Sequence, residues 1–163
     1  MINKKTKIGF IGAGYMGEGM AHNLLKNKIS LSVIANKNRK PIDRLVSQGA
    51  QELSSFEELS NNSEVILMCV SNTPTAIEII NKLLPHLKTL TLFIDLTTHH
   101  ADGSVQINEM LKSKNIRYVE APVLGGPLQA EEGVLGAIVG AKNDDFVDAK
   151  NILMNFCKDV FYF

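Results

Sequence analysis

Three glycines near the start of the chain have the spacing that points most directly to chemistry. The run Ile8-Gly9-Phe10-Ile11 is typical of a buried strand, and Gly12, Gly14 and Gly17 follow it as a G-x-G-x-x-G motif. In such a motif the first glycine allows a tight turn, the second lets the backbone approach a pyrophosphate, and the third lets the helix pack on the strand. The start of a helix also attracts phosphate. We therefore predict that a dinucleotide binds at Gly12, Ala13, Gly14, Tyr15, Met16 and Gly17.

A turn that serves packing alone is the alternative, and it gives no reason for a glycine at position 14. The residues after the second predicted strand, 31–35, bear on which dinucleotide would bind. They are Asn36-Lys37-Asn38-Arg39-Lys40, with no carboxylate before Asp43. A carboxylate here would bond the ribose hydroxyls of NAD and repel the 2′-phosphate of NADP, whereas Asn, Lys and Arg can hold that phosphate. We predict NADP, with NAD as second choice, at Asn36, Lys37 and Asn38; an ordinary basic surface loop is the alternative.

Polar residues also follow two later apolar runs, at 65–70 and 92–95. Val70-Ser71-Asn72 end the first run, and Thr97 and Thr98 follow the second. Open parallel sheets bind ligands at the carboxyl ends of their strands, although Ser, Asn and Thr are also common helix caps. The neighbouring His99 and His100 do not share a face, and no cluster of Cys or carboxylate residues completes a tetrahedral set, so we predict no metal site.

The elements that position these residues alternate between short apolar runs and helix-like stretches. This alternation predicts an α/β fold, a doubly wound, mostly parallel Rossmann-type sheet with helices on both faces. We expect one dinucleotide-binding domain over 1–163. The predicted strands cover 8–11, 31–35, 65–70, 92–95, 116–119, 136–139 and 160–163. The predicted helices cover 15–28, 40–48, 75–84, 103–113 and 144–156, with a short helix capped by Ser54 or Ser55.

The composition excludes several other classes. The chain has 163 residues, 17 basic and 17 acidic, and 45% of it is hydrophobic, which argues against disorder and against a nucleic-acid partner. Its longest apolar run, 65–70, is too short to span a membrane. Two cysteines, Cys69 and Cys157, indicate no disulfide framework. We expect a cytoplasmic protein with a small-molecule substrate.

Four motifs occur together in one order along the chain. They are Gly12-Ala13-Gly14-Tyr15-Met16-Gly17, Met20-Ala21-His22-Asn23-Leu24, Asp95-Leu96-Thr97-Thr98 and Glu120-Ala121-Pro122-Val123-Leu124-Gly125-Gly126. In these motifs the chain resembles the N-terminal NAD(P)-binding domain of the β-hydroxyacid dehydrogenases. That family includes 3-hydroxyisobutyrate dehydrogenase and is related to 6-phosphogluconate dehydrogenase. Asn36-Lys37-Asn38 lies where many NADP-using members carry Asn-Arg-Thr.

The resemblance implies roles for the later loops. Val70, Ser71 and Asn72 would lie near the nicotinamide ribose, and Thr97 would contact cofactor and substrate. The substrate-binding residues would be Thr97, Thr98, Leu124, Gly125 and Gly126. Leu124 departs from the family, which usually has a serine there, and favours a substrate with an apolar group at this point. We expect the N–H groups of Gly125 and Gly126 to remain available for an anion.

The resemblance further implies an oxidoreductase that transfers a hydride between a nicotinamide cofactor and a small carboxylate-bearing alcohol or aldehyde. The catalytic lysine of the family belongs to an all-helical C-terminal domain, which is absent from this chain, so we expect no catalytic residue here and no activity of this chain alone. A non-catalytic NAD(P)-binding module or partner subunit, and an imine-reductase-like enzyme, are the alternatives. The surface that would receive the second domain should be apolar, which makes a homo-oligomer possible.

Overall fold

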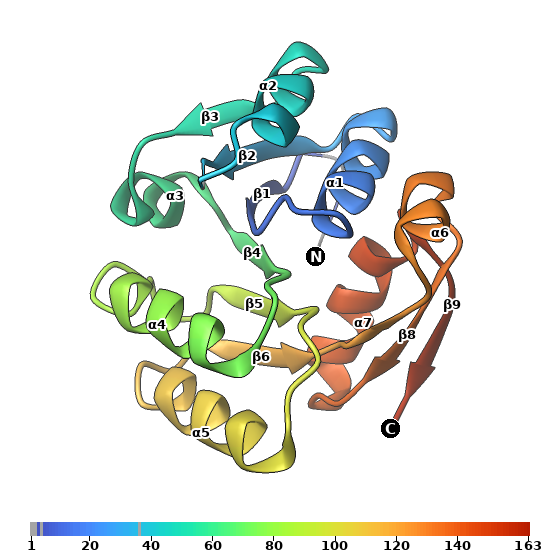
Figure 1. Cartoon of the computed structure of the whole chain (residues 1–163). Helices are drawn as coiled ribbons and strands as arrows, with labels where there is room; N and C mark the ends of the chain where they lie inside the picture. The colour runs from blue at the N-terminus through green and yellow to red at the C-terminus, as the bar shows by residue number, and fades with distance from the viewer. Residues whose placement is uncertain (1–2, 4, 36) are drawn as a thin grey trace.

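A six-stranded parallel sheet forms the centre of the molecule (Figure 1). The computed structural model describes residue 3, residues 5–35 and residues 37–163. The strand order is β3-β2-β1-β4-β5-β6, and every neighbouring pair is parallel. The strands are β1 (Lys7–Ile11), β2 (Ser30–Ile34), β3 (Gln51–Leu53), β4 (Val65–Met68), β5 (Leu92–Asp95) and β6 (Arg117–Glu120). β4 and β5 are buried at every position, because both faces of the sheet are covered, and this explains their continuous apolar runs.

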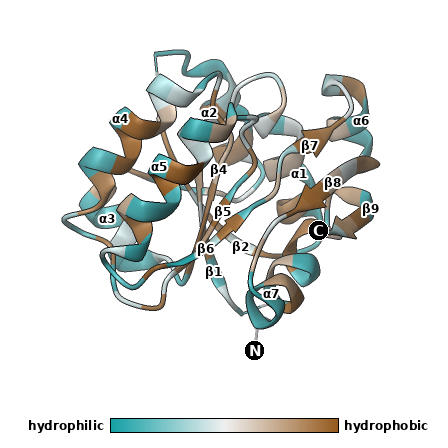
Figure 2. Cartoon of the chain, turned by 90° about the horizontal axis from the view of Figure 1, so that it is seen from below, coloured by the Kyte–Doolittle hydropathy of each residue, from teal (hydrophilic) through white to brown (hydrophobic). Residues whose placement is uncertain are grey.

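Helices cover both faces of this sheet (Figure 2). One apolar cluster joins the sheet to α1 (Gly17–Lys26), α2 (Lys40–Ser47) and α7 (Asn143–Leu153). The other joins it to α3 (Phe56–Asn62), α4 (Thr73–Leu83) and α5 (Ala101–Lys112). Phe10 and Phe93, both fully buried, belong to the first and the second cluster respectively. The predicted doubly wound α/β fold is confirmed.

Local chemistry explains where several helices begin. The Ser55 hydroxyl accepts a hydrogen bond from the Glu58 N–H at 3.1 Å and caps α3, so of the two predicted caps Ser55 is the one used. Proline stands in the first turn of both α2 and α4, where its missing N–H costs no intrahelical bond. The predicted helices all form, with ends that differ from the predicted ones by at most three residues.

The order of the strands creates a crevice for ligands. The chain runs outward from β1 through β2 to β3 and then returns, so that β4 lies on the other side of β1. The connections after β1 and β4 therefore leave the sheet in opposite directions. In open parallel sheets this switch point, at the carboxyl ends of the strands, is where ligands bind.

The last part of the chain forms a second sheet, which the sequence did not predict as separate. It contains β7 (Val123–Leu124), β8 (Leu135–Val139) and β9 (Cys157–Tyr162), in the order β7-β8-β9. β7 pairs antiparallel to β8, whereas β8 and β9 are parallel. The short helix α6 (Pro127–Glu132) connects β7 to β8, and an isolated bridge between Glu120 and Gly140 joins this sheet to β6. The predictions missed β3, β7 and α6, because the strands β3 and β7 have only three and two residues and the helix α6 only six.

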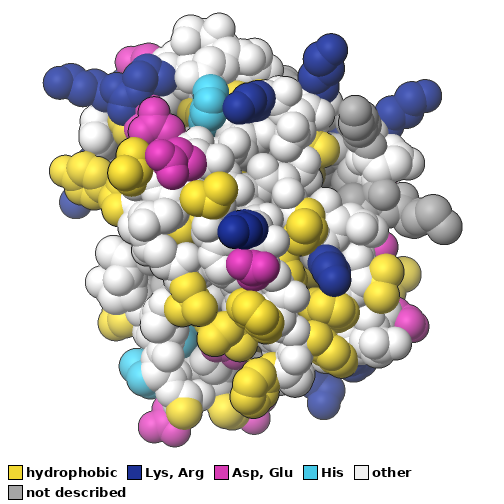
Figure 3. Space-filling view, turned by 90° about the vertical axis from the view of Figure 1, so that its right-hand side faces the viewer, with side chains coloured by type: hydrophobic (Ala, Val, Ile, Leu, Met, Phe, Trp, Pro, Cys, Tyr) yellow, Lys and Arg dark blue, Asp and Glu magenta, His cyan; other side chains and the backbone are white. Residues whose placement is uncertain are grey.

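One side of the second sheet is apolar at its surface. Figure 3 looks onto the side where α6, β8 and β9 lie, and hydrophobic side chains gather in its lower half. Leu124, Ile138, Phe161 and Phe163 are exposed. Ile138 and Phe161 are register partners on adjacent strands, so these two side chains lie on one face of the sheet. The apolar surface expected to receive a second domain stays a prediction.

Candidate functional site

The glycine-rich turn lies against the carboxyl end of β4. Gly12 has φ +94°, and a Cβ on it would come within 1.9 Å of the Cys69 carbonyl oxygen. Gly17 opens α1, and a Cβ there would come within 2.0 Å of the Gly12 carbonyl oxygen. Neither position can carry a side chain without displacing backbone. The turn therefore packs closely against the backbone at the switch point between β1 and β4.

Gly14 differs from its two neighbours in the motif. A Cβ on Gly14 would meet no described atom within 4 Å, and its backbone is not in the left-handed region. Packing within the described protein thus gives no reason for a glycine at this position. The space beside Gly14 is the cradle that a pyrophosphate needs, and the unsatisfied N–H groups of the first turn of α1 face such a ligand in this type of motif. The Tyr15 side chain next to it is 92% exposed.

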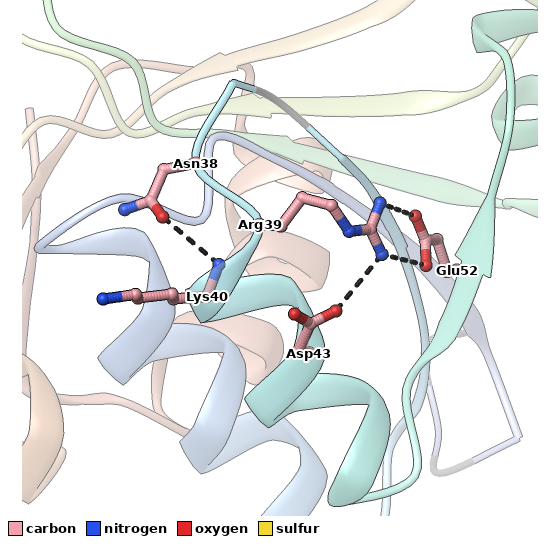
Figure 4. Close-up of polar contacts among 5 residues, drawn as sticks. All are labelled: Asn38, Arg39, Lys40, Asp43 and Glu52. Atoms are coloured by element: carbon pink, nitrogen blue, oxygen red, sulfur yellow. Dashed lines mark hydrogen bonds and ion pairs between the residues drawn. The ribbon is translucent and has the colours of Figure 1, made fainter.

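The loop after β2 contains an arginine that is already paired. Arg39 donates from Nη1 to Glu52 Oε1 at 2.9 Å, and from Nη2 to Glu52 Oε2 at 3.0 Å and Asp43 Oδ1 at 3.2 Å (Figure 4). The hydrogen bonds that Arg39 donates to Glu52 and Asp43 raise the pKa of Arg39, and the bond from Arg39 lowers the pKa of Glu52. The sequence argument counted Arg39 among cations available for a 2′-phosphate. In this structure Arg39 is paired with Glu52, because the fold brings β3 beside the loop.

The three predicted 2′-phosphate contacts are in this same loop. Asn36 lies outside the described residues. Asn38 accepts a hydrogen bond from the Lys40 backbone N–H at 3.2 Å, which shapes the loop as it enters α2. Lys37 carries its charge near Glu78 of α4, where it lowers the pKa of that carboxyl after the larger effect of Lys82. Lys37 and Asn38 remain predictions for the 2′-phosphate.

The loops after β4 and β5 are joined by hydrogen bonds. The Val70 N–H donates to the Thr97 hydroxyl oxygen at 3.1 Å, and Thr97 is almost fully buried. Asn72 caps α4 by accepting from the Thr75 N–H at 2.9 Å, so the capping alternative is right for Asn72. It is wrong for Thr97, because His100 is the residue that caps α5. The structure therefore brings Val70 and Thr97 into direct contact, as a shared site requires.

A buried network behind these loops was missed by the sequence analysis. Asp95 at the end of β5 accepts from the Thr97 N–H at 3.0 Å and from His99 Nε2 at 2.8 Å. His99 Nδ1 lies 3.0 Å from the Thr73 hydroxyl at the start of α4. The side chains of Asp95 and His99 are fully buried. The hydrogen bond to Asp95 raises the pKa of His99, and burial opposes it. This network fixes the loop after β5 to α4.

The predicted substrate loop, residues 124–126, differs from the expectation in its hydrogen bonding. Leu124 is 51% exposed, and Thr98 is exposed as well. Gly125 has φ +128°, which a side chain would strain. The Gly126 N–H donates to Gln129 Oε1 at 2.9 Å, so it is engaged within the protein. The expectation that both glycine N–H groups remain available is therefore wrong for Gly126, because α6 begins there and Gln129 caps it.

The helix after this loop is attached to the helix after the glycine turn. Asn23 of α1 donates from Nδ2 to the carbonyl oxygens of Ala130 at 2.9 Å and Glu131 at 3.0 Å. A Cβ on Gly19 would lie 2.7 Å from the Ala130 backbone, so α1 and α6 cross closely. This contact fixes the loop at Leu124–Gly126 relative to the predicted pyrophosphate turn. The sequence motif contained Asn23 but gave no sign of its partner.

Other chemistry is not evident in the described part of the chain. No group of three or more His, Cys, Asp or Glu residues among the described residues could hold a metal ion. Within the same residues no helix has the length and apolarity needed to cross a membrane. Burial raises the pKa of Cys69 and of Cys157 to about 12 each, and in Cys69 the charge of Asp95 adds to this effect. Neither thiol is suited to nucleophilic chemistry.

Comparison of the sequence with known proteins identifies a family and several relatives. The family described as the NAD binding domain of 6-phosphogluconate dehydrogenase matches residues 7–163. 2-(Hydroxymethyl)glutarate dehydrogenase of Eubacterium barkeri is 30% identical over 99% of this chain and 54% of its own length. The mitochondrial 3-hydroxyisobutyrate dehydrogenase of Drosophila melanogaster is 29% identical over 90% of this chain and 45% of its own length. The chain thus spans about half the length of these curated relatives.

The solved structures agree on the fold. A structure of Psf3 in complex with NADP+ and 2-OPP superposes with a TM-score of 0.90 at 27% identity, covering 96% of this chain and 56% of the other. The match extends over both sheets, since it includes nearly the whole chain. The expected resemblance to the N-terminal domain of hydroxyacid dehydrogenases is confirmed. From its glycine turn, its switch point and these matches, the chain belongs to the family of NAD(P)-binding domains that is described for 6-phosphogluconate dehydrogenase and shared by the 3-hydroxyisobutyrate dehydrogenases.

Proposed function

We propose that this chain is the NADP-binding domain of an oxidoreductase that transfers a hydride between the nicotinamide and a small alcohol or aldehyde bearing a carboxylate. The observation that carries the proposal is the open space at Gly14, beside a turn whose other two glycines are fully packed. The names of the two relatives above denote hydroxylated carboxylic acids, which supports the substrate class.

The residues of this chain would divide the work of binding. The turn from Gly12 to Gly17 would hold the pyrophosphate, and Lys37 and Asn38 the 2′-phosphate. Val70, Ser71, Asn72 and Thr97 would orient the nicotinamide end, where the cofactor, when bound, donates or accepts the hydride. The hydrogen bonds from the Val70 N–H to Thr97 and from the Thr97 N–H to Asp95 would hold the loops after β4 and β5 in place for the nicotinamide end.

The substrate would lie beyond the nicotinamide, next to the loops after β5 and β6. The exposed Thr98 hydroxyl can donate to a carboxylate, and the Gly125 N–H is a second candidate donor. Leu124 would contact an apolar part of the substrate. We assign no general acid or base to this chain: Lys142 precedes α7, Lys150 lies over the Phe146 ring at 5.8 Å, and Lys158 is in β9.

The glycine turn is tested by changing Gly14→Ala and measuring binding of NADP+ by isothermal titration calorimetry. The variant should fold normally, because its Cβ meets no described atom and its φ is not left-handed. Binding should be lost, because the added methyl group would occupy the position of the pyrophosphate. Gly140→Ala is the matched control, since that glycine also has open space. Undiminished affinity in Gly14→Ala would remove the proposed placement.

Turnover separates this function from its two alternatives. The complete protein should oxidise NADPH in the presence of an aldehyde that carries a carboxylate, followed spectrophotometrically. Turnover of a cyclic imine in place of the aldehyde would indicate an imine reductase, and binding of NADPH without turnover of either would indicate a non-catalytic module or partner subunit.

A further inference from the structure

The ion-pair cluster of Arg39, Asp43 and Glu52 is the feature of the site that the family resemblance leaves unexplained. Arg39 is the N-cap residue of α2, and Glu52 is in β3, the edge strand beside β2. Both Nη atoms of Arg39 bond to the two carboxylate oxygens of Glu52, at 2.9 and 3.0 Å. This bidentate arrangement is the one that gives arginine its strongest pairing with a carboxylate or a phosphate.

Figure 4 shows that the loop has two sides. The Arg39 side chain points toward Glu52 of β3 and Asp43 of α2, whereas the side chains of Asn38 and Lys40 point the other way. The cluster therefore occupies one side of the loop that is predicted to receive the 2′-phosphate. The Arg39 guanidinium belongs to the same loop as Lys37 and Asn38, and both of its Nη atoms are bonded to Glu52.

The pairing of Arg39 with Glu52 matters because of the other charges around the loop. The loop and the residues that pair with it carry three cations, Lys37, Arg39 and Lys40, and two anions, Asp43 and Glu52, which both pair with Arg39, so the net charge is only weakly positive. A phosphate monoester carries close to two negative charges at neutral pH. It would be attracted by the lysines and repelled by Glu52. The ribose hydroxyl of NAD carries no charge and would be almost indifferent to Glu52.

We propose that Glu52 is a specificity-determining residue, which keeps the Arg39 guanidinium paired and thereby limits the preference of this site for NADP over NAD. This inference rests on the proposed function, since it assumes that the adenosine end of the cofactor lies at this loop. Loss of the Glu52 charge frees two Nη donors and removes a repulsive charge. Asp43 retains one exposed contact at 3.2 Å, and an exposed ion pair of this kind yields readily to a phosphate.

The test is Glu52→Gln, with the affinities of NADP+ and NAD+ measured by calorimetry at low ionic strength. The ratio of the NADP+ to the NAD+ affinity should rise roughly three- to tenfold, the effect of one charge at contact distance when the surrounding medium is water. The NAD+ affinity itself should stay the same. Added salt should reduce the gain, because exposed charges are screened.

Two further variants show where the gain comes from. Glu109→Gln removes the same charge on α5, which packs on the part of the sheet opposite to β3, and should leave the ratio unchanged. Adding Arg39→Gln to Glu52→Gln should abolish most of the gain, because the freed guanidinium is then missing. A gain that survives in full without Arg39 would overturn the inference, since it would come from the removed repulsion and not from the freed guanidinium.

The inference and the proposed function fail in different ways. A native protein that binds NADP+ tightly, with an unchanged or lower ratio in a correctly folded Glu52→Gln variant, overturns the inference and leaves the function standing. A native protein that binds neither dinucleotide overturns both. Circular dichroism of each variant verifies folding, and both altered side chains are at the surface.

Discussion

Replacing His99 by leucine should reveal how much the buried Asp95–His99–Thr73 network stabilises the domain. The change removes the donor at 2.8 Å from Asp95 Oδ2 and leaves a fully buried carboxylate with the single hydrogen bond from the Thr97 N–H. Removing one partner of a buried ion pair costs about 3–5 kcal/mol, whereas leaving a buried acceptor without its neutral donor costs about 1–3 kcal/mol. The loss in free energy of unfolding should therefore depend on whether His99 is protonated.

The dependence on pH has a definite sign. The pKa of His99 is raised above its ordinary value of 6.5 in the folded protein, mainly by the hydrogen bond to Asp95 and further by the charges of Asp95 and Glu120, against the effect of burial. The stabilisation linked to protonation is fully present below pH 6.5 and is lost as the pH rises through the folded pKa. The difference between native protein and variant should be about 3–5 kcal/mol at low pH and about 1–3 kcal/mol at high pH.

Urea unfolding followed by circular dichroism, at one pH below 6 and one above 8, measures both values. Titrating groups away from Asp95 have the same surroundings in both proteins, so their contributions cancel in the difference. His86→Leu is the control: among the described residues His86 makes no side-chain hydrogen bond or ion pair, and its replacement should change the stability by less than about 0.5 kcal/mol. A difference for His99→Leu that is equal at both pH values, or larger at high pH, would refute the reasoning.

Two further predictions concern Asn23 and the two cysteines. Asn23→Leu removes the donor to the Ala130 and Glu131 carbonyls and should lower the free energy of unfolding by about 1–3 kcal/mol. Amide hydrogen exchange in α6 should accelerate, whereas exchange in β4 and β5 should change only in proportion to the global stability. Equal acceleration everywhere would show that α6 is not held by this contact. Cys69 and Cys157, with pKa values of about 12, should resist a thiol reagent at pH 8 in the native state and react after unfolding. Rapid labelling of the native protein would contradict their burial.

Much of the fold could be predicted from the sequence because its signals are local. The apolar run 65–70 and the segment 92–95 become the buried strands β4 and β5, since a strand covered on both faces needs apolar residues throughout. The helices follow from apolar spacing, and Ser55 from its capping chemistry. β3, β7 and α6 escaped prediction because such short elements depend on the pairing partners that the fold provides.

In the candidate site, too, some features could be predicted from the sequence and others depend on the tertiary structure. The sequence by itself determined the glycine turn, because G-x-G-x-x-G expresses backbone requirements within six residues, and the structure explains Gly12 and Gly17 by contacts of 1.9 and 2.0 Å. Only the tertiary structure decided the electrostatics. Arg39 meets Glu52 thirteen residues away and His99 meets Thr73 twenty-six residues away, in each case across neighbouring elements of the fold. Which charges are paired depends on distance in space, and composition and spacing along the chain carry no record of it.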